Sequence, residues 1–294
     1  MDAGDLRIFE AVARLGGMNR AAAELNTVQS YVTARIRQLE AELGETLFQR
    51  HSRGVVLTAA GRRLLPYAER VGHLLEEARR AVGDDGRPKG GLALGSLETT
   101  AALRLPPVLA AYAAAYPDVD LILRTGTTAE LVEEVLGHRL EGAFVCGPVD
   151  HPDLAEESIF REELVLVTAP GIRQPPDLAS QARLKIVVLR AGCSYRQRLE
   201  AILAVKGIVG LRRLEFGTID GILGCVGAGL GVSLLPRGVV AAAARDGKVA
   251  LHALPPEEAE VATVFIRRSD ALVSSALRAF VDCARPTAAR AAAE

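Results

Sequence analysis

The chain has 294 residues, of which 49% are hydrophobic and 24% charged, and its formal net charge at pH 7 is −1. This composition is typical of a globular protein with two or three compact units, and it excludes a chain that binds polyanions over its whole surface. No long uninterrupted apolar stretch appears and the N-terminal residues lack a signal-peptide core, so we expect a cytoplasmic protein with no membrane partner. The four cysteines show no metal-ligand spacing, and we expect no structural disulfides among Cys146, Cys193, Cys225 and Cys283.

The N-terminal region has the apolar spacing of short helices. Residues 4–15 are predicted to form a helix that closes the core beneath two further helices. Residues 17–39 contain two runs at helical intervals, separated by the short segment Leu25-Asn26-Thr27, and this arrangement predicts a helix-turn-helix. Asn19 precedes the first run and can cap it, and Thr27, with Ser30 three residues on, predicts that the second helix begins near residues 27–29. The apolar positions are Ala21, Ala22, Leu25, Val28, Val32, Ile36 and Leu39.

The polar side of the second helix suits contacts with DNA. Gln reads adenine edges, Arg reads guanine or phosphate, and hydroxyls near a helix N-terminus suit phosphate oxygens. Residues 50–54, RHSRG, then precede an apolar strand and predict a basic wing that could reach the backbone or the minor groove. The alternative is an ordinary amphipathic helix pair with solvated arginines. The candidate DNA-binding residues are Asn19, Arg20, Thr27, Gln29, Ser30, Tyr31, Thr33, Arg35, Arg37, Arg50 and Arg53.

The order helix, helix, LGETLFQR, wing, LTAAGRRLL resembles the N-terminal domain of the LysR-type transcriptional regulators. The matching residues are Ala21-Ala22, Leu25, Gln29, Val32, Ile36, Leu39-Glu40, Leu43-Gly44, Leu47-Phe48, Arg50, Leu57-Thr58 and Gly61. The family usually has Pro after the Gln, where this chain has Ser30, and Ser-Arg-Gln before the Ile, where it has Thr33-Ala34-Arg35. The usual Arg at position 34 is therefore missing, and Arg35 would replace it from a direction about 100° around the helix.

Residues 58–83 predict one long helix capped by Thr58. Its apolar stripe is too long for one small domain to cover and favours a partner helix, although packing against its own chain is the alternative. In the family that this chain resembles, the corresponding helix pairs two protomers. The resemblance therefore implies a homodimer or homotetramer that presents two recognition helices to a near-palindromic site.

Residues 84–91, DDGRPKGG, have the composition of a hinge. From residue 92 onward predicted strands and helices alternate, which indicates an α/β fold with a parallel sheet and ligands at the carboxyl ends of its strands. The order of elements resembles the effector domain of the same family, which is similar to periplasmic binding proteins. It implies two α/β lobes joined by crossing strands, one at about 92–161 and 267–294 and the other at about 162–266. The expected organisation is thus a winged helix-turn-helix at 1–57, a linker helix at 58–83, a hinge at 84–91 and an effector domain at 92–294.

Three turns in the C-terminal region, at residues 96–100, 125–128 and 193–195, end strands and begin helices and are rich in hydroxyls. Helix N-termini together with Ser and Thr side chains form anion sites, although simple capping explains the same residues. Thr99 and Thr127 fall where ligand-binding hydroxyls usually lie in the family. The effector candidates are Ser96, Thr99, Thr100, Thr127, Cys193, Ser194 and Thr218. A small carboxylate or similar polar anion is the expected ligand, but Glu98, if it points inward, would repel an anion and would suit an amine, so that an amino acid or zwitterion is the alternative.

Two other classes of function are weighed against an effector-controlled regulator. Cys193 resembles the reactive cysteine of the family's peroxide sensors, and Arg196 with the helix N-terminus could lower its pKa, but no resolving cysteine follows it closely. An enzyme is not expected, because the five histidines lie in no recognisable catalytic motif.

The function expected from the sequence is therefore that of a LysR-type regulator without a cofactor. The resemblance implies four partners: promoter DNA, a small-molecule effector, a second copy of the chain and RNA polymerase. Within the family, the segments GSLETTAALRLPPVLAAY and RTGTTAELVEEVL look most like regulators of sarcosine oxidase and cell division.

Overall fold

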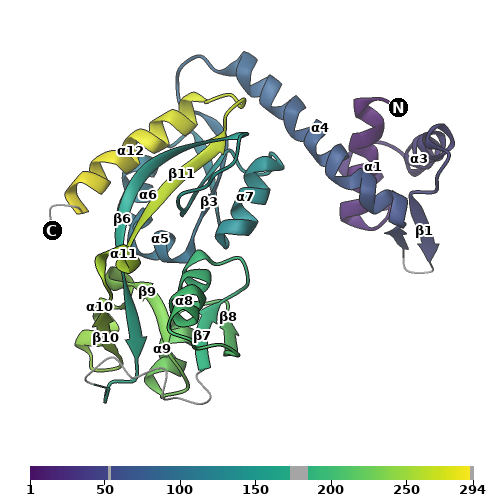
Figure 1. Cartoon of the computed structure of the whole chain (residues 1–294). Coiled ribbons are helices and arrows are strands. Elements are labelled where there is room, and N and C mark those ends of the chain that lie inside the picture. Colours follow the sequence, from purple (N-terminus) through teal and green to yellow (C-terminus); the bar gives the residue numbers. More distant parts are fainter. Residues whose placement is uncertain (52–53, 173–184, 292–294) are drawn as a thin grey trace. The chain divides into compact units, whose positions relative to one another are not determined.

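The computed structural model of the chain describes residues 1–51, 54–172 and 185–291, and the side chains of residues 50 and 286–291 are not described (Figure 1). The chain forms two compact units. One contains Met1–Asp84 and Gly137–Arg139, and the other contains Asp85–Leu136 and Leu140–Glu294. None of the described helices has the length and apolar character needed to cross a membrane.

The N-terminal unit is a winged helix-turn-helix followed by a long helix (Figure 1). Its core consists of side chains from the first three helices, the long helix and the start of the first strand, and Phe9 and Phe48 lie with ring centroids 5.2 Å apart. The turn after the third helix is fixed by the carboxylate of Glu40, which accepts hydrogen bonds from the backbone N–H groups of Leu47 and Phe48. The elements are α1 (Ala3–Leu15), α2 (Met18–Glu24), α3 (Gln29–Leu43), β1 (Phe48–His51), β2 (Gly54–Leu57) and α4 (Ala59–Gly83).

The observed caps differ in part from those expected. Thr58 caps α4 as predicted, and its hydroxyl accepts a hydrogen bond from the backbone N–H of Gly61 at 3.0 Å. Helix α3 begins at Gln29 with Val28 as its N-cap, within the predicted range of 27–29, but Asn19 does not cap α2, because Gly17 is its N-cap, and neither helix has a side-chain cap. Hydroxyl and amide side chains are common at N-caps. The N-cap is, however, the residue with extended backbone just before the helix, and the conformation of the turn decides which residue that is.

The wing lies close to the helical core, and this contact requires a glycine. Gly54 begins β2 with φ of 140°, and a Cβ there would lie 2.5 Å from the carbonyl oxygen of Gly16. The next residue, Val55, donates its N–H to that same carbonyl oxygen at 3.1 Å. A residue with a side chain at position 54 would therefore separate the wing from the end of α1.

Where the sequence predicted a parallel sheet, the described part of the C-terminal unit contains one large mixed sheet and a separate two-stranded parallel sheet of β7 and β8. Seven described strands pair in the order β10-β6-β11-β5-β3-β4, with β9 also pairing with β6. Only the β3–β4, β3–β5 and β7–β8 pairs are parallel, while β11 and β6 run antiparallel to their neighbours. The strands are β3 (Gly90–Ser96), β4 (Val119–Thr125), β5 (Gly142–Cys146), β6 (Leu154–Thr168), β7 (Lys185–Leu189), β8 (Arg212–Phe216), β9 (Ser233–Pro236), β10 (Ala250–Ala253) and β11 (Glu260–Arg268).

Strand β6 joins two lobes. Up to Glu163 it pairs with β11 beside the strands of the first lobe, and from Leu164 to Thr168 it pairs with β9 and β10 in the second lobe. Strand β11 lies beside β5 over residues 263–266, so the chain re-enters the sheet of the first lobe before the expected boundary at 266. The periodicity of a strand shows that it is buried, but not which neighbour it pairs with.

Helices cover both lobes. In the first lobe α6 packs on α12, where the hydroxyl of Tyr112 donates a hydrogen bond to the carbonyl oxygen of Ala276. Arg104 separates the helices α5 and α6. The helices are α5 (Glu98–Leu103), α6 (Leu105–Ala115), α7 (Thr128–Leu136), α8 (Ser194–Val205), α9 (Ile219–Gly227), α10 (Arg237–Arg245), α11 (Pro256–Ala259) and α12 (Ser275–Ala291).

Candidate functional site

The recognition helix α3 exposes a polar surface at its N-terminal end. Gln29, Ser30 and Tyr31 are exposed, and the Gln29 side-chain amide donates a hydrogen bond to the Thr33 hydroxyl at 3.1 Å. No side chain caps this end of the helix, so the first-turn backbone N–H groups can donate to a phosphate oxygen. A fixed amide beside an open helix N-terminus is an arrangement that can contact a base edge and the backbone of DNA together.

The other predicted DNA-binding residues are less uniform. Asn19, Arg20 and Arg37 are exposed, whereas Thr27 and Thr33 are half-buried in the turn and on α3. Arg50 lies in β1, where it pairs with Val55, and Arg53 lies outside the described residues.

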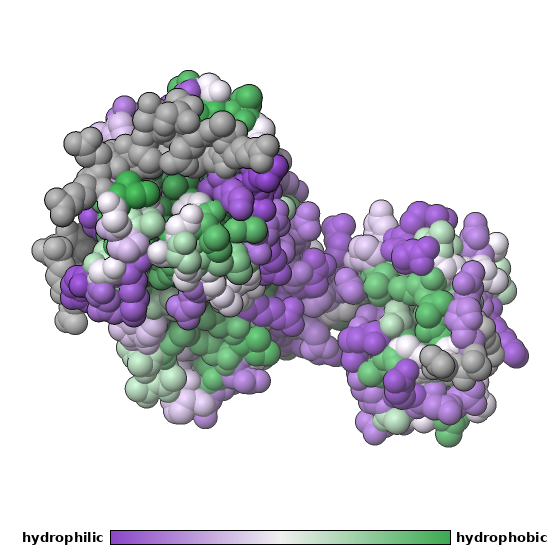
Figure 2. All heavy atoms as spheres, turned by 90° about the horizontal axis from the view of Figure 1, so that it is seen from below, coloured by the Kyte–Doolittle hydropathy of each residue, from purple (hydrophilic) through white to green (hydrophobic). Residues whose placement is uncertain are grey.

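Figure 2 shows apolar surface interspersed with polar surface on the visible face of the molecule. The exposed large apolar side chains of the N-terminal unit are Met1, Val28, Tyr31, Leu43, Val56, Tyr67, Leu74, Leu75 and Val82.

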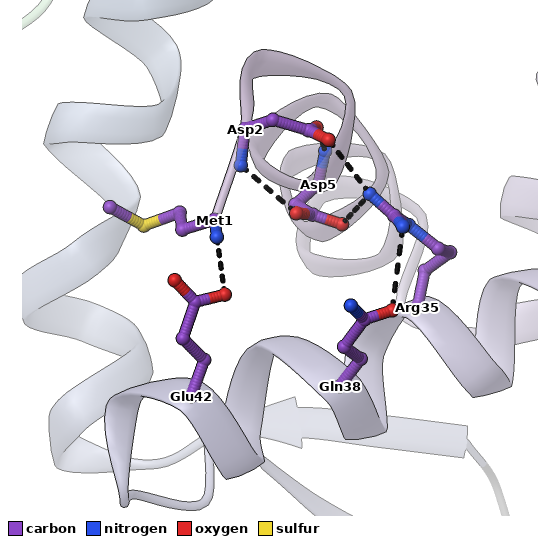
Figure 3. Close-up of polar contacts among 6 residues, drawn as sticks. All are labelled: Met1, Asp2, Asp5, Arg35, Gln38 and Glu42. Carbon is purple, nitrogen blue, oxygen red and sulfur yellow. Dashed lines mark hydrogen bonds and ion pairs between the residues drawn. The ribbon is translucent and has the colours of Figure 1, made fainter.

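Arg35 does not project freely, because it forms ion pairs with the N-terminal end of α1 (Figure 3). Its guanidinium lies 2.5 Å from a carboxylate oxygen of buried Asp5 and 3.0 Å from one of Asp2, and it also donates to the Gln38 side chain at 3.4 Å. Asp2 and Asp5 in turn form a capping box at the start of α1. Arg35 therefore joins α3 to α1. Because its guanidinium is held in these ion pairs, this geometry does not support the expectation that Arg35 contacts DNA in place of the missing Arg at position 34.

In the C-terminal unit, the three hydroxyl-rich turns converge on one pocket of about 50 Å³. Thr99 comes from the start of α5, Thr127 from the turn after β4 and Cys193 from the turn before α8. Each of the three turns lies between the end of a strand and the start of a helix. The turns meet because these strand ends lie where the two lobes face each other. The full lining consists of Leu97, Glu98, Thr99, Thr125, Gly126, Thr127, Leu189, Arg190, Cys193, Tyr195 and Gly217.

Some polar groups of the pocket already have partners. The Thr127 hydroxyl accepts from the backbone N–H of Glu130, and the Glu130 carboxylate accepts from the backbone N–H of Thr127. This carboxylate also lies 3.9 Å from the Arg190 guanidinium. Glu98 Oε1 accepts a hydrogen bond of 3.2 Å from the backbone N–H of Ile219 at the start of α9, so a carboxylate of the first lobe occupies a helix N-terminus of the second.

Two buried hydroxyls in the pocket lie beside each other and have no other hydrogen-bond partner among the described residues. They belong to Thr99, which is 2% exposed, and Tyr195, which is 3% exposed. Burial raises the pKa of Tyr195, and the nearby Thr99 hydroxyl lowers it only partly, so the phenol keeps its proton at neutral pH. A buried hydroxyl without a partner costs free energy, and here each can be satisfied by an acceptor in the pocket.

Four predicted effector residues lie outside the pocket lining because their hydroxyls serve local structure. Ser96 donates to the carbonyl oxygen of Leu97, Ser194 to the Thr128 hydroxyl, and Thr218 caps α9. Thr100 is buried beside Thr99 in α5. The sequence analysis missed Tyr195 and Arg190, although both lie within three positions of Cys193. Their positions next to a predicted strand-to-helix turn could have indicated that these two side chains line the site.

The environment of Cys193 is opposite to the one expected. Burial raises the pKa of its thiol, and this effect outweighs the nearby backbone N–H groups and Arg196. Burial also raises the pKa of Cys146 to about 11. Because the thiolate is the reactive form, this geometry does not support peroxide sensing at Cys193. Within the described residues, no group of His, Cys, Asp and Glu side chains is placed to hold a metal ion.

Comparison with known families places both units in the same group of proteins. Residues 3–62 match the family described as bacterial regulatory helix-turn-helix protein, lysR family. Residues 85–289 match the LysR substrate binding domain.

Individual relatives cover nearly the whole chain. The transcriptional regulator GltR of Bacillus subtilis (strain 168) is 46% identical over 279 residues, which are 94% of this chain and 93% of that protein. CzcR of Bacillus anthracis is 40% identical and SoxR of Arthrobacter sp. (strain TE1826) is 39% identical, each over 96% of both chains. Among solved structures, full-length CbnR in complex with its target DNA has a TM-score of 0.68 at 26% identity, over 98% of this chain and 100% of that one.

Arg35 and Arg37, on the same helix, provide a matched test of the recognition surface. We predict that Arg35→Gln lowers the free energy of unfolding by about 2 kcal/mol, because it leaves the buried Asp5 carboxylate without its cation. Arg37→Gln removes an exposed side chain and should change stability by less than about 0.5 kcal/mol. Urea unfolding of both variants checks this. Equal stability losses would contradict the structural role of Arg35.

Proposed function

The chain belongs to the LysR family of bacterial transcriptional regulators, and from this membership we propose that it binds a near-palindromic promoter site as a dimer or tetramer under the control of a small carboxylate. Its relatives are transcriptional regulators rather than enzymes. Regulators of this family carry a DNA-binding and an effector-binding domain, and this chain has both.

The proposed DNA contacts come from the start of α3. Exposed Gln29 lies beside the open helix N-terminus, so its amide can pair with an adenine edge while Ser30 and the backbone N–H groups bind phosphate. Tyr31, half-exposed at 50%, stands next to them and can contact a base or sugar. The CbnR structure, whose protein is bound to its target DNA, supports this use of the fold.

The proposed dimer forms through α4. In the single chain this helix exposes Tyr67, Leu74, Leu75 and Val82, at 63%, 48%, 41% and 92%, and such a stripe is stable in water when a second helix covers it. A two-fold pair would present two α3 helices to two half-sites. A regulator of chromosomal DNA would work in the cytoplasm. RNA polymerase is a further proposed partner there.

The proposed effector site is the pocket between the lobes. The observation that carries this assignment is the pair of buried hydroxyls, Thr99 and Tyr195, that line it and have no partner other than each other in the part of the chain that the structure describes. A carboxylate oxygen accepts hydrogen bonds and would satisfy both. Because the pocket touches both lobes, a ligand there can change how the lobes close on each other and so bias the DNA-binding state.

We predict that Gln29→Ala weakens binding to the DNA upstream of this gene by about tenfold or more, since a good bidentate base contact is worth about 1–3 kcal/mol. A gel shift with competitor DNA, at one stated salt concentration, measures this. The matched control is Gln197→Ala, which changes an exposed glutamine of α8 and should leave the shift unaltered. Retention of full sequence preference by Gln29→Ala would refute the proposed base contact.

A second pair of variants tests the pocket. We predict that Thr99→Val weakens the binding of short carboxylates such as acetate or propionate by about tenfold, because a hydrogen bond to a charged group contributes roughly 1.5–3 kcal/mol. Thr263→Val is the control, since Thr263 is also buried with an unpartnered hydroxyl but lies outside the pocket lining. Isothermal titration calorimetry compares them. Equal affinities of the two variants would remove Thr99 from the site.

A further inference from the structure

The charge inside the pocket restricts which ligand can enter it. Glu98 lines the pocket and has no cationic side-chain partner among the described residues. Its carboxylate accepts a hydrogen bond from the backbone N–H of Ile219. A simple carboxylate bound nearby would meet this negative charge, and two carboxylates that share a site repel each other.

The same carboxylate suits a ligand ammonium group. An ammonium carries several N–H donors and no acceptor, so it can donate to Glu98 while the Ile219 N–H continues to donate to Glu98 Oε1. Charge-assisted hydrogen bonds of this kind are stronger than neutral ones. The pocket therefore offers the carboxylate of Glu98, the guanidinium of Arg190, which also lies 3.9 Å from the Glu130 carboxylate, and two buried hydroxyls at Thr99 and Tyr195.

The size of the pocket sets a further limit. Its volume of about 50 Å³ is well below the range of about 300–1,000 Å³ that is common for drug-sized ligands. A cavity of this size accommodates a few non-hydrogen atoms. The ligand must therefore carry its positive and negative groups close together on a short skeleton.

We propose that the pocket selects a short α-amino acid over the corresponding simple acid, with Glu98 binding the ammonium group and the hydroxyls of Thr99 and Tyr195 binding the carboxylate. This inference rests on the proposed function, because it assumes that the effector occupies this pocket. It adds Glu98 as the residue that distinguishes a zwitterion from an anion. It also adds Tyr195 as the buried donor that completes the carboxylate site.

The test compares amino acids with their desamino counterparts on the full chain. Glycine, alanine, serine and threonine are paired with acetate, propionate, 3-hydroxypropionate and 3-hydroxybutyrate, and Kd is measured by calorimetry with thermal unfolding as a second readout. We expect at least one amino acid to bind at least tenfold more tightly than its partner. Tyr195→Phe, which removes only the hydroxyl, should weaken that amino acid about tenfold.

Glu98→Gln gives the decisive comparison, because glutamine keeps an oxygen that can accept from the Ile219 N–H while losing the charge. It should reduce the preference for the amino acid over its desamino partner by at least tenfold, through weaker binding of the first and tighter binding of the second. Glu133→Gln, at an exposed position of α7, is the control and should leave the preference unchanged.

The outcomes separate this inference from the proposed function. If the acids bind as well as or better than the amino acids, and Glu98→Gln leaves the ratio unchanged, the zwitterion assignment is overturned and the carboxylate pocket stands. If neither set binds, both are overturned. Circular dichroism and thermal unfolding of each variant show whether a lost affinity reflects the pocket or a lost fold.

Discussion

The C-terminal unit depends on one shared strand. Strand β6 pairs with β11 in the first lobe and, without interruption, with β9 and β10 in the second. Because backbone hydrogen bonds fix β6 in both lobes, the turns that follow β3, β4 and β7 are brought to one place. The pocket, its buried hydroxyls and the Glu98 contact to α9 all result from this arrangement.

The N-terminal unit follows a similar logic on a smaller scale. Buried Asp5 and Arg35 connect α1 to α3 (Figure 3), and Glu40 fixes the turn that leads into the wing. These contacts set the orientation of α3 and leave its first turn exposed. Arg35 connects α3 to α1, whereas Gln29 and Arg37 are exposed. Rigid support of a few exposed side chains is what allows a short helix to read a sequence.

Much of this architecture could be predicted from the sequence because helical spacing and turn residues are local signals. The helix-turn-helix, the Thr58 cap and the alternation of strands and helices are examples, and so are the three turns that line the pocket, whereas the two lobes were implied by the family resemblance. What the sequence could not show is long-range pairing. The partner of Arg35 lies on another helix, the direction of β11 depends on its neighbours, and the environment of Tyr195 is produced by both lobes. Burial of Cys193 likewise reversed the pKa shift that its position in the sequence suggested.

The central claim is that the pocket and α3 are energetically coupled in one molecule. The most direct measurement is the Kd of the tightest-binding small acid or amino acid, determined by calorimetry with the free protein and with the protein saturated by its promoter DNA. Coupling requires that DNA change the ligand Kd by the same factor by which the ligand changes the DNA Kd. We predict equal factors of about 5 or more. A ligand Kd that is identical with and without DNA would contradict the account.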